Sequence, residues 1–266
     1  MRVLAVVNQK GGVGKTTTSV NLAAALAGLG QRVLLVDLDP QGNATMGSGI
    51  DKRAATRTVY HAMLGLRTVA EVRQRSEAGG YDVLPANREL AGAEIELVAL
   101  EEREACLKKV IDTTRLDYDF VFIDCPPSLS LLTVNGLVAA QAVLIPMQCE
   151  YYALEGLSDL VATVRRVRAN LNPRLEIAGL LRTMYDPRNT LTLQVSQQLE
   201  THFGDKVYRT LVPRNVRLAE APSHGTPAVN WDRASRGAQA YLSLAEEILG
   251  KPPRTGAETT YGTAPA

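Results

Sequence analysis

A glycine-rich segment near the start of the sequence, residues 9–17 (QKGGVGKTT), ends in a lysine and two threonines. Glycines let backbone N–H groups approach an anion closely, and a helix that starts after them adds the positive end of its dipole. The Lys15 ammonium group can reach the β- and γ-phosphates of a nucleotide, and the Thr16 hydroxyl can bind Mg²⁺. A glycine-rich turn that binds nothing does not need these side chains. We therefore expect residues 9–17 to hold Mg·ATP.

This segment departs from the usual phosphate-loop pattern, G-x-x-x-x-G-K-[ST]. Gln9 stands where that pattern has its first glycine. The surrounding order of elements still fits, because an apolar strand pattern precedes the segment and a helical pattern follows it. The context therefore favours a phosphate loop in spite of Gln9.

Three acidic side chains follow or close apolar runs that we predict as strands. Asp37 and Asp39 come after residues 33–36, and Asp124 closes the run that begins at residue 120. Side chains two residues apart in an extended chain face the same way, so Asp37 and Asp39 can point at one site. We predict that Asp124 holds Mg²⁺ through water, that Asp37 lies near the metal, and that Asp39 orients the attacking water.

Two of these carboxylates also have a purely structural alternative. Asp124 stands two residues before the pair Pro126 and Pro127, where an aspartate can cap a helix. Asp39 stands before Pro40 and Gly42, where it can form an Asx turn. The residues alone leave both alternatives open.

The elements that must position these groups alternate between strands and helices, which is typical of a parallel sheet with helices on both faces. We predict strands at residues 2–8, 32–37, 81–85, 120–124, 142–146 and 176–184. We predict helices at residues 15–29, 89–114, 129–139, 152–170, 191–203 and 235–249. The fold class is therefore α/β, a single-domain, doubly wound and mostly parallel sheet. Ligands bind at the carboxyl ends of the strands in such sheets, where the loop and the carboxylates all lie.

The composition is ordinary for a globular protein, with 266 residues, 45% hydrophobic and 21% charged residues. The net charge of +1 gives no argument for a nucleic-acid or membrane partner from the chain as a whole. Three cysteines without metal-ligand spacing, no secretory leader pattern and no run of about 18 apolar residues indicate a cytoplasmic protein. Residues 1–250 form the predicted domain, and the Pro-, Gly- and Thr-rich residues 251–266 form a tail that we expect to be disordered.

Five segments together resemble the ParA/Soj chromosome- and plasmid-partitioning ATPases, which carry a deviant Walker A loop. They are KGGVGKTT, VDLDPQGNAT, FIDCPPSL, PMQCEYYALEG and VPRNVRLAEAPSHG. The resemblance runs from about residue 2 to residue 249, and the segments follow the family order. KGGVGKT alone would also fit MinD-like cell-division ATPases and nitrogenase iron proteins. The combination implies a P-loop ATPase that needs ATP and Mg²⁺.

The resemblance implies roles for residues around the nucleotide. Asp39 matches the family's catalytic carboxylate and Asp124 its Walker B acid. Pro213 and Asn215 fall where the family contacts adenine, although their sequence alone indicates only a turn. The remaining matches form the phosphate and Mg²⁺ contacts, and they are Gly11, Gly12, Val13, Gly14, Lys15, Thr16 and Thr17.

The resemblance also implies a dimer when ATP is bound. Lys10 matches the signature lysine, which crosses to the partner's ATP and neutralises charge in the transition state, as an arginine finger does elsewhere. Gly11 matches a position where the subunits approach closely, and Glu150 is expected to contact the nucleotide across the dimer. For Glu150, a favourable charge at a helix N-terminus is the alternative.

The family implies partners as well: non-specific double-stranded DNA of the nucleoid, and a ParB-type centromere-binding protein that stimulates hydrolysis. Arg188 and Arg217 match positions implicated in DNA binding, and Arg233 and Arg236 lie near them in the sequence. A MinD-like membrane-cycling ATPase is the alternative function, but residues 251–266 lack the amphipathic helix that it would need. A nucleotide-binding adaptor without turnover is a third possibility.

Overall fold

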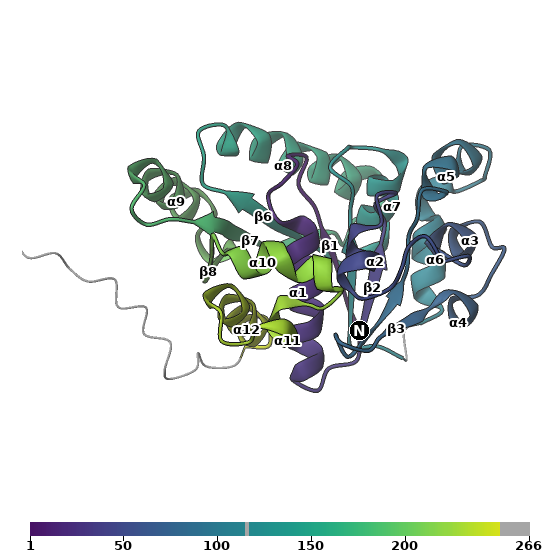
Figure 1. Cartoon of the computed structure of the whole chain (residues 1–266). Helices are drawn as coiled ribbons and strands as arrows, with labels where there is room; N and C mark the ends of the chain where they lie inside the picture. Colours follow the sequence, from purple (N-terminus) through teal and green to yellow (C-terminus); the bar gives the residue numbers. More distant parts are fainter. Residues whose placement is uncertain (115–116, 251–266) are drawn as a thin grey trace, which may run out of the picture.

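The computed structural model describes residues 1–114 and 117–250, so the tail predicted at residues 251–266 lies outside the described part. Eight strands form one sheet in the order β3-β4-β2-β5-β1-β6-β7-β8 (Figure 1). All neighbouring strands are parallel except β3 and β4. The strands are β1 (Arg2–Val6), β2 (Val33–Asp37), β3 (Gln74–Ser76), β4 (Tyr81–Leu84), β5 (Phe120–Asp124), β6 (Ala142–Gln148), β7 (Glu176–Tyr185) and β8 (Val207–Pro213). The predicted α/β class with a mostly parallel sheet is confirmed.

Helices cover both faces of this sheet, and in Figure 1 α8 and α12 lie on opposite sides of it. Within the described ranges, none of the helices combines the length and apolar character needed to cross a lipid bilayer. The helices are α1 (Lys15–Gly28), α2 (Asn43–Gly47), α3 (Val59–Met63), α4 (Val69–Val72), α5 (Leu90–Leu97), η1 (Arg103–Ala105), α6 (Cys106–Asp112), α7 (Leu131–Ala139), α8 (Ala153–Asn170), α9 (Thr190–Phe203), η2 (Gly204–Lys206), α10 (Val216–Glu220), η3 (Ala221–His224), α11 (Ala228–Trp231) and α12 (Arg236–Ile248).

The central strands are apolar along their length because both of their faces are buried. In β1, Val3 and Ala5 join the core that packs against α7 and α8. Leu4 and Val6 point the other way and join the core that packs against α1 and α12. The alternation of side chains across the sheet thus gives the protein two hydrophobic cores, one on each face.

The central strands β1, β2 and β5 end in register with one another at the carboxyl edge of the sheet. Val6 at the end of β1 pairs with Asp124 at the end of β5, and Asp124 also pairs with Asp37 at the end of β2. The chain that leaves β1 therefore enters residues 7–14 directly beside the two aspartates. This register brings the phosphate loop and the predicted metal site together.

All six predicted strands are present, with ends that differ by a few residues from the prediction. The short edge strand β3 and the edge strand β8 were not predicted. Strand β8 carries polar residues at its exposed positions, and the Glu247 carboxylate accepts hydrogen bonds from the N–H groups of Arg209 (2.8 Å) and Thr210 (3.0 Å). A side chain from α12 thus covers part of this edge, which protects it from pairing with another strand.

The helix predicted at residues 89–114 is wrong as a single element. The chain forms α5, a 3₁₀ turn and α6 instead. Glu102 lies between them with a left-handed φ of 53°, which no α-helix accommodates. The other predicted helices are correct to within two residues, whereas the short helices α2, α3, α4, α10 and α11 were not predicted because each has too few residues to show a period.

Gly136 in α7 tests how tightly the helix packs under the site. A Cβ at this position would lie 2.8 Å from Cys125 Sγ and 3.4 Å from both Ile123 and Leu38. Gly136→Ala should therefore destabilise the protein by about 1–3 kcal/mol in a denaturant titration. Gly156→Ala in α8 is the matched control, since a Cβ at this position would meet nothing within 4 Å. This substitution should stabilise the helix by about 0.5–1 kcal/mol. Equal effects at both positions would contradict this packing.

Candidate functional site

The phosphate loop presents a continuous row of backbone donors. None of the N–H groups of residues 11–17 donates to an acceptor within the part of the chain that the structure describes. Gly12 and Gly14 have φ values of 74° and 89°, which only glycine adopts without strain. Gly14 is also the N-cap of α1 and supplies no side-chain cap, so the first turn of that helix keeps its donors available. Such an arrangement of N–H groups at a helix N-terminus is suited to bind an anion.

Lys15 brings a positive charge into this loop. Its side chain is largely buried, with 8% of the residue exposed, and its Nζ donates to the carbonyl of Lys10 at 3.2 Å. Burial lowers the pKa of Lys15, and the nearby carboxylates of Asp124 and Asp39 act in the opposite direction. The ammonium group therefore lies against the loop and is close enough to both acids to be influenced by their charge.

Asp124 is fully buried at the end of β5 and is held by two hydroxyls of α1. Thr16 Oγ1 donates to Oδ2 and Ser19 Oγ donates to Oδ1, both at 2.8 Å. Burial, and then the charge of Asp37, raise the pKa of Asp124 to about 7. The alternative role as a helix cap is not observed, because Ser130 is the N-cap of α7. Ser19 was missed by the sequence analysis, although it lies three residues after Thr16 on the same face of the helix.

Asp37 is also fully buried, and its carboxylate fixes the start of α2. Oδ2 accepts from the N–H and the hydroxyl of Thr45, both at 2.7 Å, and Oδ1 accepts from the N–H of Asp39 at 3.2 Å. Burial raises the pKa of Asp37 to about 6, which the Thr45 hydrogen bonds partly offset. The structure thus places Asp37 beside Asp124, as predicted, but gives it a structural task that the sequence did not indicate.

Asp39 shows the Asx turn that was the alternative to a catalytic role. Its Oδ1 accepts from the N–H of Gln41 at 2.9 Å, and its carbonyl accepts from the N–H of Gly42 at 2.8 Å. Its Oδ2 has no partner in the described part of the chain. One oxygen therefore fixes the turn, and the other remains available to a water molecule near Lys15.

A magnesium ion at this edge would have few ligands from the protein. Among the described residues, no group of three or more His, Cys, Asp or Glu side chains is arranged to hold a metal. Mg²⁺ commonly takes one or two protein oxygens together with phosphate oxygens and waters. Thr16 and Asp124 fit this pattern, and a divalent cation would balance the charge of the two buried acids.

The residues predicted to act across a dimer meet within one chain. Lys10 Nζ forms an ion pair with Glu150 Oε2 at 2.5 Å, and both side chains are about half exposed. A Cβ added to Gly11 would meet nothing within 4 Å, so this part of the loop is open to an approaching surface. Lys10 and Glu150 therefore share one exposed position beside the phosphate loop.

The predicted adenine contacts lie at the end of β8, a strand that runs parallel to β7. Pro213 is the last residue of β8. Asn215 is the N-cap of α10, and its Oδ1 accepts from the N–H of Arg217 at 2.9 Å. Both residues thus end up at the carboxyl edge of the sheet, and their contact with a base stays a prediction.

The four predicted DNA-binding arginines differ in their surroundings. Arg188 makes two hydrogen bonds to the carboxylate of Asp186, at 2.9 and 2.7 Å. Arg217 forms ion pairs with Glu220 and Asp232, at 2.9 and 3.2 Å. Arg233 and Arg236 are exposed and form no ion pair with the rest of the described chain. Arg233 and Arg236 are therefore the more available of the four to an external phosphate.

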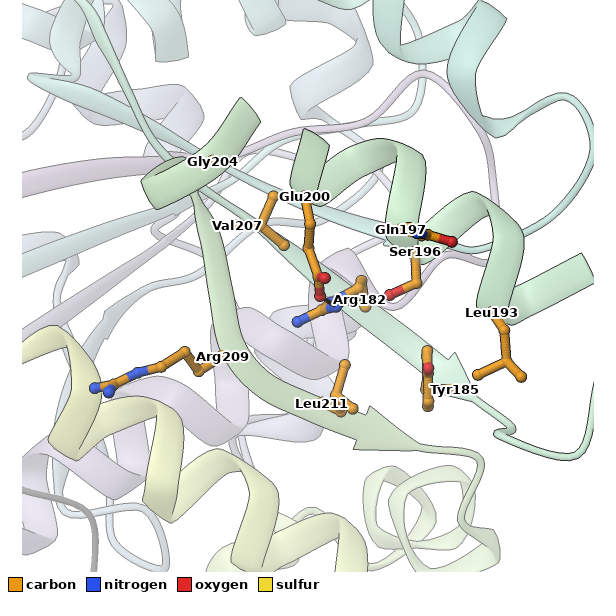
Figure 2. Close-up of a pocket in the computed structure, with 10 residues that line it drawn as sticks. All are labelled: Arg182, Tyr185, Leu193, Ser196, Gln197, Glu200, Gly204, Val207, Arg209 and Leu211. Atoms are coloured by element: carbon orange, nitrogen blue, oxygen red, sulfur yellow. Dashed lines mark hydrogen bonds and ion pairs between the residues drawn. The ribbon is translucent and has the colours of Figure 1, made fainter. Parts of the chain in front are cut away.

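One cavity of the described chain lies beside the phosphate loop, and another lies at the edge of the sheet. A cavity of about 250 Å³ reaches Thr16 and Thr17 between α1, α2 and η3. A cavity of about 650 Å³ lies between β7, β8 and α9, and includes none of the predicted site residues (Figure 2). There the guanidinium of Arg182 donates to Ser196, Glu200 and the carbonyl of Tyr208. These bonds attach α9 to the edge of the sheet, so we assign this second cavity a structural role.

The chain is similar along almost its whole length to chromosome-partitioning proteins. A family model described as an AAA domain matches residues 1–177. The sporulation initiation inhibitor protein Soj of Bacillus subtilis is 54% identical over 247 residues, which cover 93% of this chain and 98% of that protein. The chromosome partitioning protein ParA of Caulobacter vibrioides is 51% identical over 253 residues, which cover 94% of this chain and 95% of that protein.

Two solved structures show the same fold with nucleotide bound. Cobyrinic acid a,c-diamide synthase of Mycobacterium smegmatis, with an ATP analogue and magnesium, is 38% identical with a TM-score of 0.83, over 96% of this chain and 100% of that one. The septum site-determining protein MinD of Pyrococcus horikoshii, with Mg-ADP, is 25% identical with a TM-score of 0.78, over 93% of this chain and 95% of that one. Each of these two proteins therefore binds a magnesium nucleotide on the same fold.

The two buried acids predict an unusual dependence of stability on pH. The pKa of Asp124 is about 7 in the folded chain and about 3.9 in an unfolded chain. Because the folded state binds the proton more tightly, stability falls as the pH rises from about 4 to about 7. Without nucleotide, Asp124→Asn should therefore stabilise the protein at pH 8, by on the order of 2 kcal/mol, and have little effect at pH 4.

Asp119→Asn is the control for this pH prediction, with the opposite sign. Hydrogen bonds from Arg32 lower the pKa of Asp119 to about 2, so that its stabilisation is present above pH 4 and is lost as the pH falls towards 2. Chemical denaturation across this range measures both variants. A loss of stability in Asp124→Asn at pH 8 would contradict the assignment of Asp124 as a buried acid whose ionisation destabilises the fold.

Proposed function

The chain belongs to the ParA/Soj family of chromosome-partitioning ATPases, and we propose that it segregates DNA by a cycle of ATP-dependent dimerisation and release. In this cycle ATP closes a dimer, the dimer binds double-stranded DNA of the nucleoid without sequence preference, and hydrolysis releases it. A centromere-binding partner of the ParB type stimulates the hydrolysis. ATP and Mg²⁺ are the cofactors.

The observation that carries this proposal is the meeting of three features at one sheet edge. The amides of residues 11–17 are without protein acceptors among the described residues, Lys15 lies beside them, and Asp124 is held by Thr16. A triphosphate would satisfy the donors and the ammonium group together. Bound Mg²⁺ would neutralise phosphate charge, held by Thr16 directly and by Asp124 through water.

Hydrolysis further needs a positioned water and neutralisation of the developing charge. Asp39 is suited to the first task, because one carboxylate oxygen is fixed by Gln41 and the other is available. Lys10 is suited to the second task if its side chain leaves Glu150 for the nucleotide of a partner subunit. The ion pair with Glu150 would then be a feature of the single chain that dimerisation replaces.

DNA binding would depend on arginines near the α10–α12 region. A protein that neutralises phosphates loses affinity as the salt concentration rises. Dimerisation would join two such patches and roughly double the number of phosphate contacts, so ATP could control DNA affinity. Arg233 and Arg236 are suited to this role because their charges are not compensated by neighbouring acids in the described chain.

A membrane-cycling ATPase and an adaptor without turnover remain the competing functions. The MinD structure shows that the fold serves a septum site-determining protein as well. Sedimentation with liposomes separates the first competitor from our proposal, since we expect no ATP-dependent pelleting. Measurement of phosphate release separates the adaptor from our proposal, since an adaptor without turnover would release no phosphate.

The double variant Arg233→Gln with Arg236→Gln should weaken DNA binding in the presence of ATP. The slope of log affinity against log salt should fall by about 0.9 for each phosphate contact that is lost. A mobility-shift titration with ATP and with ADP measures this slope. Arg168→Gln is the control, because Arg168 is an exposed residue of α8 on the opposite face of the sheet. Equal wild-type affinity with ATP and ADP would count against the proposed cycle.

Asp39→Ala should lower phosphate release by roughly 100-fold in the presence of DNA and partner, while ATP binding persists. Asp51→Ala is the matched control, since Asp51 Oδ1 also accepts from a backbone N–H two residues later, that of Arg53, at 2.9 Å. Loss of an exposed Asx turn alone would affect both variants alike. If the two variants hydrolyse ATP at the same rate, Asp39 has no catalytic role.

A further inference from the structure

Two side chains from neighbouring strands hold the outer side of the phosphate loop. Gln148 ends β6, and its Nε2 donates to the carbonyl of Gly12 at 3.1 Å. Thr183 lies in β7, and its Oγ1 donates to the carbonyl of Val13 at 2.8 Å. The two residues are partners in the β6–β7 register. They therefore form one support, built from adjacent strands, for two consecutive peptide groups of the loop.

The direction of these two carbonyls decides the direction of the next two N–H groups. None of the described peptide bonds is cis, and in a planar trans peptide the carbonyl of one residue and the N–H of the next point in opposite directions. When Gln148 binds the Gly12 carbonyl, the N–H of Val13 points away from β6. When Thr183 binds the Val13 carbonyl, the N–H of Gly14 points away from β7.

The next peptide group continues the same pattern. The carbonyl of Gly14 accepts from the N–H of Thr18 at 2.9 Å, which is the first bond of α1, so the N–H of Lys15 faces the helix N-terminus. The carbonyls of Gly12 and Val13 are thus bound by side chains of the neighbouring strands, and that of Gly14 is bound by α1. This leaves three consecutive N–H groups facing the site. Without the two side chains, glycine on either side of Val13 would leave these peptide planes free to rotate.

The burial of Thr183 makes its bond difficult to replace by water. Thr183 is 2% exposed, and its methyl group lies beside Gly14, where an added Cβ would come within 3.8 Å. A buried carbonyl that loses its only hydrogen-bond donor is left unsatisfied, and the full free energy of its desolvation then destabilises this conformation. The loop would be expected to turn its carbonyl elsewhere and to misdirect the N–H of Gly14.

We propose that Thr183 and Gln148 are positioning residues for nucleotide binding, which act by holding the Gly12 and Val13 carbonyls outward so that the following amides face the phosphates. This inference rests on the proposed function, because it assumes that the loop binds ATP. The amides of the loop contact phosphates that ATP and ADP share. Loss of the support should therefore weaken both nucleotides to a similar extent.

The direct test compares Thr183→Val with Thr183→Ser by calorimetric titration with Mg·ATP and with Mg·ADP. Valine keeps the shape but removes the donor, and loss of one such bond weakens binding roughly tenfold. Serine keeps the donor and should bind both nucleotides within about twofold of wild type. Rescue by serine is a result that a purely structural role of the side chain would not give.

Thr192→Val is the matched control. Thr192 is also buried and donates to a carbonyl, that of Cys149, at 3.4 Å, but it does not touch the loop. This variant should change the melting temperature without a change in nucleotide affinity. Gln148→Met is a second variant for the case that Thr183→Val does not fold, since Gln148 is only half-buried at a strand end, and it should weaken both nucleotides as well.

The outcomes separate this inference from the proposed function. Wild-type protein that binds neither nucleotide would overturn the proposed function, and the inference with it. Wild-type protein that binds both, with unchanged affinity in Thr183→Val and Gln148→Met, would overturn the inference alone. Failure of serine to restore binding would also overturn it.

Discussion

The direction of the backbone N–H groups between residues 11 and 17 is the constraint on which the site depends. Seven consecutive donors without acceptors in the described chain are tolerable only where an anion or water can reach them. Carbonyl groups on the outer side of the loop are held by Gln148 and Thr183. In the proposed function these donors form a phosphate site whose geometry is supported by the neighbouring strands as well as by the loop itself.

The sheet supplies the second half of the site by register. Parallel pairing puts Asp37 and Asp124 side by side at the end of β2 and β5, where burial raises the pKa of both carboxyl groups. Such a pair destabilises the fold when both are ionised. A bound Mg²⁺ ion would relieve this repulsion, so the free energy that the ionised pair costs the protein without ligand would favour binding of the cation.

The phosphate loop and the central strands could be predicted from the sequence because their signals are local. Continuous apolar runs mark buried strands, and Lys15 and Thr16 after three glycines mark a phosphate site. The supporting residues could not be predicted in the same way. Ser19 and Thr183 bind partners that lie 105 and 170 residues away in the sequence, and Thr45 lies in α2, which is too short to show a period. The prediction of one helix at residues 89–114 was wrong because Glu102 adopts a left-handed conformation. The composition around it is helical and gives no sign of this break.

Amide hydrogen exchange at residues 11–17, measured with and without Mg·ATP, tests the central claim most directly. We predict fast exchange in the protein alone, because these N–H groups have no acceptor in the described chain, and strong protection when nucleotide is added. The amides of α8, on the far side of the sheet from α1, should change little and provide an internal reference. Exchange at residues 11–17 that is equally fast with saturating Mg·ATP would contradict the assignment of this loop as the nucleotide site.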